Sequence, residues 1–274
     1  MITAQSAISR FHRDLTLGVL VKMVLFGAVV ASFVGTVLGW HVDVTIVLVI
    51  VSGVWIMLSM RAAYGSRLAA ASPPLIAAGQ FDAAEEQIAG ALRSFSISRK
   101  VKLLSLHHLA VLRHAQRKWQ DAAMLCRALL GDRPNRRDGT SLMRSARLML
   151  AESLLELNDL TGTYKEIQRL HDPAVGRGMR LGEAMHLMLV QLDYESRIGA
   201  WASMMMGLTR KVELAELMPS DGAARTQSLL ALAAGRMGRM DWANWLKGRA
   251  ELLRDPAGII ADRPVVAELW GAVG

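Results

Sequence analysis

The chain has 274 residues, of which 52% are hydrophobic, and its 32 Lys and Arg exceed its 24 Asp and Glu to give a net charge of +8. This hydrophobic content is high for a water-soluble protein and indicates membrane segments. The single cysteine, Cys126, excludes an internal disulfide and a multi-cysteine metal site. Positive charge is concentrated in residues 61–140, which hold thirteen Lys and Arg against six Asp and Glu. Such an excess is typical of cytoplasmic segments beside a membrane.

Two hydrophobic runs near the N-terminus predict a transmembrane helical hairpin within residues 15–60. They cover residues 15–38 and 42–60, and each is close to the roughly 20 residues that a helix needs to cross a bilayer. Lys22 lies near the polar end of the first run, from where its long stem can carry the ammonium to the headgroups. A signal peptide is the alternative for the first run, but the run is long for one and a second run follows at once.

The charges around the hairpin predict its topology. Lys and Arg flank both outer ends, and the short loop between the runs carries none. We therefore expect both termini, including a cytoplasmic segment of residues 1–14, on the cytoplasmic side of a bacterial inner membrane. Small residues recur every fourth position at Gly27, Ala31, Gly35 and Gly39, which lets another helix approach closely. That helix is either the second span or a helix of another copy of the chain.

Beyond residue 60 the apolar residues follow a period of 3.6, which predicts an all-α fold. Residues 61–73 are interpreted as a juxtamembrane stem, residues 74–256 as a domain of paired helices, and residues 257–274 as a tail or cap. Prolines separate the periodic segments at intervals of 39, 46 and 37 residues, namely Pro134, Pro173, Pro219 and Pro256. These intervals suit a repeat of two short helices and a turn. The pair Pro73-Pro74 leaves little room for a first helix before Gly79.

Residues 79–84, 117–122 and 238–243 share one turn scheme: a turn residue, a polar residue, a large apolar residue, and an acid shortly before alanine. This scheme resembles the turn of the tetratricopeptide repeat (TPR), in which the large residue fills the space between two antiparallel helices. Around the second turn Ala110, Ala122 and Pro134 follow at intervals of twelve, as in that repeat. Weaker versions occur at residues 158–163 and 199–204. The resemblance implies a TPR-like α-solenoid of three to five repeats.

The two apolar runs, the basic segment and the repeats together resemble the bacterial membrane-anchored TPR proteins of the HemY type. This resemblance is one of architecture, and no CxxCH haem-attachment motif occurs in the chain. In TPR proteins the first helix of each pair lines a concave surface that binds partners. Matched through the small positions Ala110, Ala151, Leu192 and Ala231, the resemblance implies a partner-binding groove for a protein or peptide that contains His107, His114, Glu152, His186, Asp193 and Arg225.

Groove side chains of this kind are expected to be solvated. Alanine at His114, Glu152 and Asp193 is then expected to abolish partner binding without affecting the fold. Separately, Arg133, Arg136 and Arg137 belong to the densest basic feature of the chain. We expect them to contact anionic lipid; a solvated face and nucleic acid are the alternatives, although no groove-reading motif or interleaved aromatic residues accompany them.

Motifs for catalysis are missing from the sequence. It contains no GxSxG, Walker A, GxGxxG or HExxH pattern, so we predict no catalytic residue, no cofactor and no metal. Cys126 falls at a packed apolar position of a repeat and is interpreted as core. The sequence thus predicts a membrane-anchored, non-enzymatic adaptor or scaffold for protein interactions. A homo-oligomeric structural scaffold and a non-catalytic accessory subunit of a membrane complex are the alternatives.

Overall fold

The computed structural model describes residues 2–38, 44–96, 98–131, 140–176 and 178–271. These residues form helices joined by short connections, with no strand among them, so the predicted all-α fold is confirmed. The chain divides into two compact units, Met1–Met149 and Leu150–Gly274. The boundary falls inside one helix, and the units are described separately.

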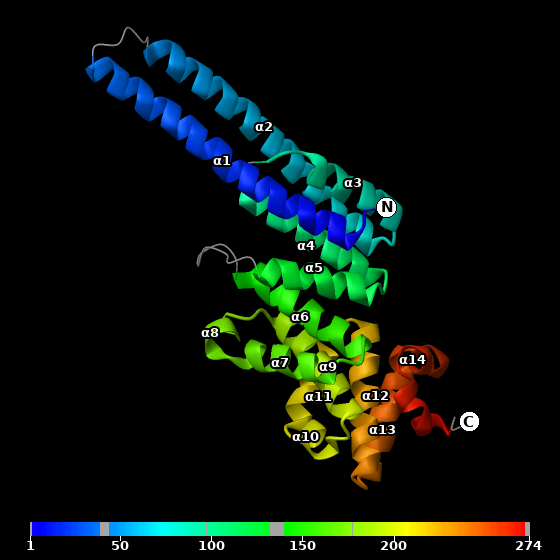
Figure 1. Cartoon of the computed structure of the whole chain (residues 1–274). Helices are drawn as coiled ribbons and strands as arrows, with labels where there is room; N and C mark the ends of the chain where they lie inside the picture. Colours follow the sequence, from blue (N-terminus) through cyan, green and yellow to red (C-terminus); the bar gives the residue numbers. More distant parts are fainter. Residues whose placement is uncertain (1, 39–43, 97, 132–139, 177, 272–274) are drawn as a thin grey trace. The chain divides into compact units, whose positions relative to one another are not determined.

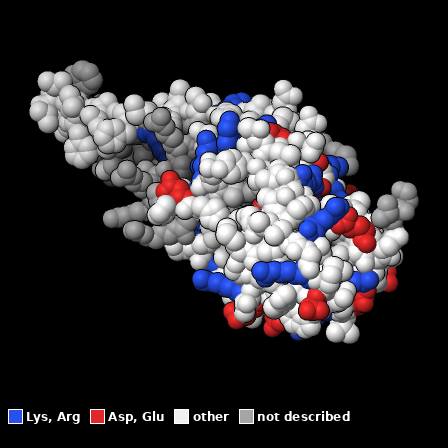
Figure 2. Space-filling model, turned by 90° about the horizontal axis from the view of Figure 1, so that it is seen from below, with Lys and Arg blue, Asp and Glu red and all other residues white. Residues whose placement is uncertain are grey.

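Two long helices, α1 (Ala4–Val37) and α2 (Val44–Ala77), run side by side in the first unit (Figure 1). Both are long and apolar enough to cross a membrane. Their large apolar side chains are mostly exposed, as at Met23 (69%), Phe26 (71%) and Val37 (87%), whereas the core helix of a soluble protein buries such side chains. In Figure 2 the described surface of this hairpin, at the upper left, is almost entirely white, whereas blue and red side chains are scattered among white ones on the rest of the visible face.

Only part of the small-residue stripe on α1 is buried. Gly35 is buried with its neighbour Ser32. Gly27 and Ala31 are exposed, and a Cβ on Gly27 would meet no atom within 4 Å. Gly39 lies outside the described residues. The stripe as a whole is therefore not a continuous contact with α2, and its association with a second copy stays a prediction.

The first turns of α1 pack into the helical domain of the same unit. Ala4, Ala7 and Phe11 follow the helical spacing of three and four residues and are buried. Lys102, only 1% exposed, holds the carboxylate of Asp14 at 2.6 Å and donates to the backbone oxygens of Leu92 at 2.8 Å and Ser94 at 2.6 Å. Residues 4–14 are thus an integral layer of the domain. A soluble fragment without the hairpin, starting at residue 61, would therefore lose part of the packing of this domain.

Helix α2 continues without interruption through Pro73 and Pro74 and supplies the first helix of the first helix pair. A helical proline has no N–H to donate to the carbonyl four residues earlier, which here belongs to Ala69. That carbonyl accepts hydrogen bonds instead from the Ser72 hydroxyl at 2.8 Å and from Nδ1 of His108 at 2.8 Å. These side chains replace the missing backbone bond. The expectation that the two prolines leave little room for a first helix is therefore wrong.

Five helix pairs follow one another along the described residues. Their members are α2 and α3 (Phe81–Arg93), α4 (Arg99–Ala115) and α5 (Trp119–Gly131), α6 (Thr140–Glu156) and α7 (Leu160–His171), α9 (Leu181–Arg197) and a broken helix of α10 (Trp201–Met205) and α11 (Leu208–Glu216), and α12 (Ser220–Arg236) and α13 (Met240–Leu253). The short α8 (Pro173–Gly176) lies between the third and fourth pairs. The last elements are α14 (Pro256–Asp262) and the 3₁₀ helix η1 (Pro264–Trp270).

All five turns have the same backbone geometry. The turn residue is left-handed, with φ between 57° and 73°, at Gly79, Arg117, Asn158, Gly199 and Gly238. Its N–H donates to the carbonyl three residues earlier, and the next N–H donates to the carbonyl five residues earlier. These bonds satisfy carbonyls that the end of the first helix leaves free. The weaker sequence matches at Asn158 and Gly199 therefore form the same turn as the three stronger ones.

A pair of buried positions, twelve residues apart, lies across each turn. The first-helix positions are Ser72, Ala110, Ala151, Leu192 and Ala231, and the second-helix positions are Ala84, Ala122, Thr163, Met204 and Ala243. Every one of these ten residues is at most 5% exposed. In four pairs both residues are small, so the two helices can approach closely. The described residues thus form repeat-like helix pairs in one register.

The fourth pair departs from this pattern because both of its positions, Leu192 and Met204, are large. Their side chains prevent the close approach that alanine allows, and the second helix breaks after Met205. The chain passes through Gly207 at a φ of 64° and resumes as α11. Nζ of Lys211 on α11 donates to the backbone oxygens of Ser203 at 3.0 Å and Met204 at 2.9 Å. This ammonium caps the carbonyls at the break, and burial lowers the pKa of Lys211.

Candidate functional site

The predicted groove residues of the second unit lie together in one ionic cluster. The Arg225 guanidinium is 3.6 Å from the Glu152 carboxylate and also pairs with Asp193. Nε2 of His186 is 2.8 Å from the other oxygen of Glu152. The first helices α6, α9 and α12 position these side chains, as the register predicts.

Three further residues complete this cluster, and the sequence analysis missed them. Arg263, between α14 and η1, lies 3.1 Å from each Asp193 oxygen and 2.8 Å from Glu156. Arg197 reaches Glu156 at 3.3 Å and donates to the Leu155 carbonyl at 2.7 Å. Glu156 follows Glu152 by one helical turn, a spacing that could have identified it. No helical spacing links Arg263 to the cluster, because this residue belongs to the segment that was interpreted as a tail or cap.

The expectation that these groove residues are solvated is wrong for Glu152 and Asp193. Asp193 is 1% exposed and Glu152 is 9% exposed. Three carboxylates and three guanidiniums neutralise one another, which permits their burial. His186, with a side chain 34% exposed, lies at the edge of the cluster. The residues at the centre of the cluster therefore hold the unit together, and alanine at Glu152 and Asp193 would not test partner binding alone.

The predicted groove histidines of the first unit, His107 and His114, both lie on α4. Nε2 of His107 is 3.1 Å from the Ser145 hydroxyl of α6. Burial lowers the pKa of His107 to about 4, with a smaller contribution from the neighbouring His108. His114 contacts the Trp119 ring edge to face, at 5.1 Å between centroids. Both side chains are partly buried. Arg133, Arg136 and Arg137 lie outside the described residues.

The described part of the chain offers neither a metal site nor a reactive thiol. Among the described residues no three His, Cys, Asp or Glu side chains gather as a metal site. Cys126 is fully buried, as its interpretation as core predicts, and burial raises the pKa of its thiol to about 12. A thiol with this pKa is protonated at neutral pH and is a poor nucleophile.

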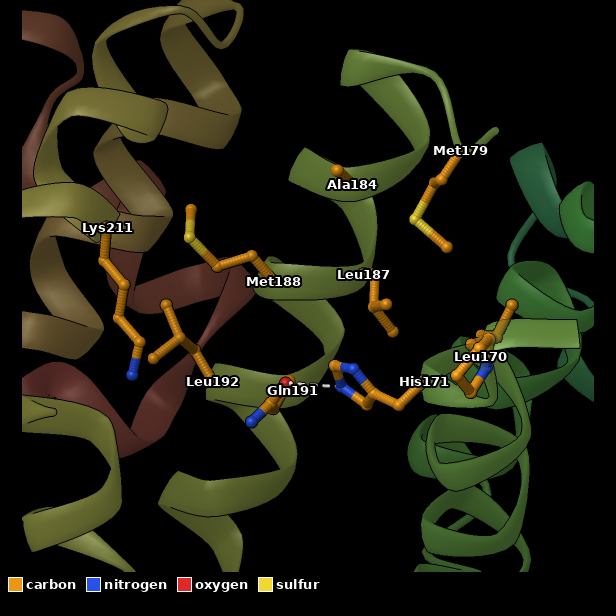
Figure 3. Close-up of a pocket in the computed structure, with 10 residues that line it drawn as sticks. Leu170, His171, Met179, Ala184, Leu187, Met188, Gln191, Leu192 and Lys211 are labelled. Carbon is orange, nitrogen blue, oxygen red and sulfur yellow. Dashed lines mark hydrogen bonds between the residues drawn. The ribbon is translucent and has the colours of Figure 1, made fainter. Parts of the chain in front are cut away.

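A pocket of about 520 Å³ opens in the second unit beside the broken helix pair (Figure 3). Its volume falls in the range of about 300–1,000 Å³ that is usual for ligand sites. Helices α7, α8, α9 and α11 and the connection after α8 supply its lining: Leu170, His171, Pro173, Met179, Ala184, Leu187, Met188, Gln191, Leu192 and Lys211. Apolar side chains dominate this lining, and the hydrogen bond of 3.1 Å from His171 to Gln191 crosses it.

This pocket was not predicted from the sequence. Its place beside the fourth helix pair could have been indicated by Leu192 and Met204, which are large where the other pairs have small residues. No family model, curated protein or solved structure matches the chain. The features of the chain that bear on its function are therefore the helix pairs, the apolar hairpin and the pocket.

Proposed function

We propose that this chain is a membrane-anchored adaptor of the TPR type. Helices α1 and α2 hold it in a bacterial inner membrane with both termini in the cytoplasm, and its helix pairs bind another protein. The common register of the five helix pairs supports the likeness to TPR proteins, since ten buried positions and five turns repeat it. The exposed apolar surface of the hairpin supports the membrane anchor.

The pocket beside α9 is the binding site that we propose in the second unit. Its lining is apolar and includes Met179 and Met188, whose flexible side chains adapt to different shapes. An apolar side chain from a helix or extended segment of the partner would fill it. The ionic cluster already has internal partners for its buried carboxylates, so only its edge at His186 is offered to a ligand.

Site-specific photo-crosslinking tests this proposal. A photoreactive phenylalanine analogue replaces Met188 in the pocket or His186 at the edge of the cluster, two positions that lie on nearly opposite faces of α9. Leu252 on α13, which is 87% exposed, is the matched background position. We expect a defined foreign protein to be crosslinked in cells from position 188 and much less from position 252.

Three other crosslinking results would each point to a different conclusion. Crosslinking from position 186 but not 188 would place the partner on the predicted groove instead of the pocket. A crosslink to a second copy of the chain would favour the homo-oligomeric scaffold. Equal background from all three positions would contradict the adaptor function.

A further inference from the structure

Two cavities of the first unit meet at Lys22 on α1. The larger, of about 940 Å³, extends along α1 and reaches Ser96 and Arg99 at the connection between α3 and α4. The smaller, of about 270 Å³, lies between Lys22 and Trp55 of α2 and reaches Ser98. Lys22 is exposed in its helix, and it lines both cavities. The two spaces therefore share one basic residue, which lies within the first two turns of the apolar run.

The polar end of this combined cavity is lined by two basic side chains and two hydroxyl groups. The basic side chains are Lys22 and Arg99, and the hydroxyl groups belong to Ser96 and Ser98. Asp14 is the one acid among the described lining residues, and it is held by the buried Lys102 at 2.6 Å and lies 3.9 Å from Arg13. Its charge is thereby compensated from outside the cavity. A phosphate or another anion would find two cations and hydroxyl donors at this end.

The other end of the cavity is apolar. Val19, Met23 and Val24 of α1 line the larger space, and Trp55 and Leu58 of α2 line the smaller one. Tryptophan is favoured at the level of lipid headgroups, where its ring is apolar and its N–H is polar. A charged lysine in an apolar helix is costly unless it reaches the interface or a counter-ion. A polar end joined to apolar channels matches a phospholipid, with its charged headgroup and acyl chains.

We propose that this cavity binds an anionic phospholipid, with the headgroup phosphate between Lys22 and Arg99 and the acyl chains along α1 and α2. This inference rests on the proposed membrane anchoring. Lys22 belongs to the hairpin, and Arg99 is the first residue of α4, directly after the α3–α4 connection. A lipid bound to both residues therefore links these two parts of the unit.

The test uses the full chain purified in a mild detergent, with bound lipids counted by native mass spectrometry. Phosphatidylglycerol is compared with phosphatidylcholine, and inorganic phosphate is added in a separate arm. The double variant Lys22→Gln with Arg99→Gln removes both cavity cations. The matched control, Arg61→Gln with Lys100→Gln, removes two exposed cations next to residues of the cavity lining.

We expect one phosphatidylglycerol to bind about tenfold more tightly than phosphatidylcholine, and the cavity variant to lose this preference while the control keeps it. Equal binding of the two lipids by the unmodified chain would overturn the proposal without any variant. An equal loss in the control would show general charge attraction and overturn it as well. Displacement of the lipid by millimolar inorganic phosphate would mean that the site binds the free ion. Because binding is measured in detergent, failure of the membrane anchor would be seen separately, as a chain absent from the membrane fraction.

Discussion

Replacing Arg113 by alanine is expected to destabilise the first unit by about 3–5 kcal/mol, because it leaves a buried carboxylate without its partner. Arg113 is 2% exposed and donates to both oxygens of Glu85, at 3.0 and 3.1 Å. It also donates to the Ile2 carbonyl at 2.6 Å and to Gln116 at 2.7 Å. One guanidinium thus joins the residues before α1 to α3 and α4.

The pH dependence of this interaction has a definite sign. Arg113 lowers the pKa of Glu85, the N–H of Ile2 adds to this effect, and burial opposes it. A carboxyl group with a lowered pKa in the folded state stabilises the fold above its ordinary pKa, and this contribution is lost as the pH falls through the lowered value. We therefore expect the difference between the unmodified chain and the Arg113→Ala variant to shrink in acid.

Urea unfolding of the full chain in mild detergent measures this effect. Arg127→Ala removes an exposed arginine of α5 and is expected to change stability by less than about 0.5 kcal/mol. The double variant Arg113→Met with Glu85→Leu removes both charges, so it should be more stable than Arg113→Ala. Equal stability of Arg113→Ala and Arg127→Ala would contradict the buried ion pair.

Replacing Asp193 by alanine is the second change with a large expected effect, about 3 kcal/mol in the second unit. Asp193 is 1% exposed and pairs with both Arg225 and Arg263. Its removal leaves the partly buried guanidinium of Arg225 paired with Glu152 and that of Arg263 paired with Glu156. Nε of Arg263 would also lose its bifurcated contact with the two Asp193 oxygens, which joins the residue before η1 to α9.

Asp221→Ala is the matched control for this substitution. Asp221 has a side chain 79% exposed and lies 3.6 Å from Arg254, so its pair is expected to contribute less than about 1 kcal/mol. The comparison is made by urea unfolding and by near-ultraviolet circular dichroism, to which the seven tryptophans contribute. One of them is Trp270 of η1, whose Nε1 donates to Glu251 at 2.6 Å. A variant at position 193 as stable as the variant at 221 would mean that the carboxylate is solvated and available to a partner.

The register of the helix pairs could be predicted from the sequence, whereas the residues that contact each helix from distant parts of the chain could not. Small residues recur at positions such as Ala110 and Ala122 because four of the five pairs make the same close helix contact, so local spacing carries the information. The turn at Asn158 could be predicted for the same reason, although Thr163 replaces the expected alanine. Asn tolerates the left-handed conformation that this turn requires.

What faces a given helix position could not be predicted from spacing. The register assigns Asp193 to a helix face but says nothing of Arg263, which arrives from seventy residues further along the chain. The same holds for Asp14 and Lys102, a contact between α1 and α4. Pro73 predicts a break in the helix, and spacing does not reveal that the distant His108 joins Ser72 in bonding the carbonyl that this proline leaves without its usual donor. Long-range partners of this kind are properties of the folded state.

The proposed function requires that α1 and α2 cross a membrane as a hairpin and hold the helix pairs on the cytoplasmic side. Reporter fusions to the full chain in a Gram-negative host measure this topology. An alkaline phosphatase, active only in the periplasm, is inserted after Trp40 or fused after Gly274. We expect an active enzyme at the first position and an inactive one at the second. Inactivity at both positions, or activity at the C-terminus, would contradict it.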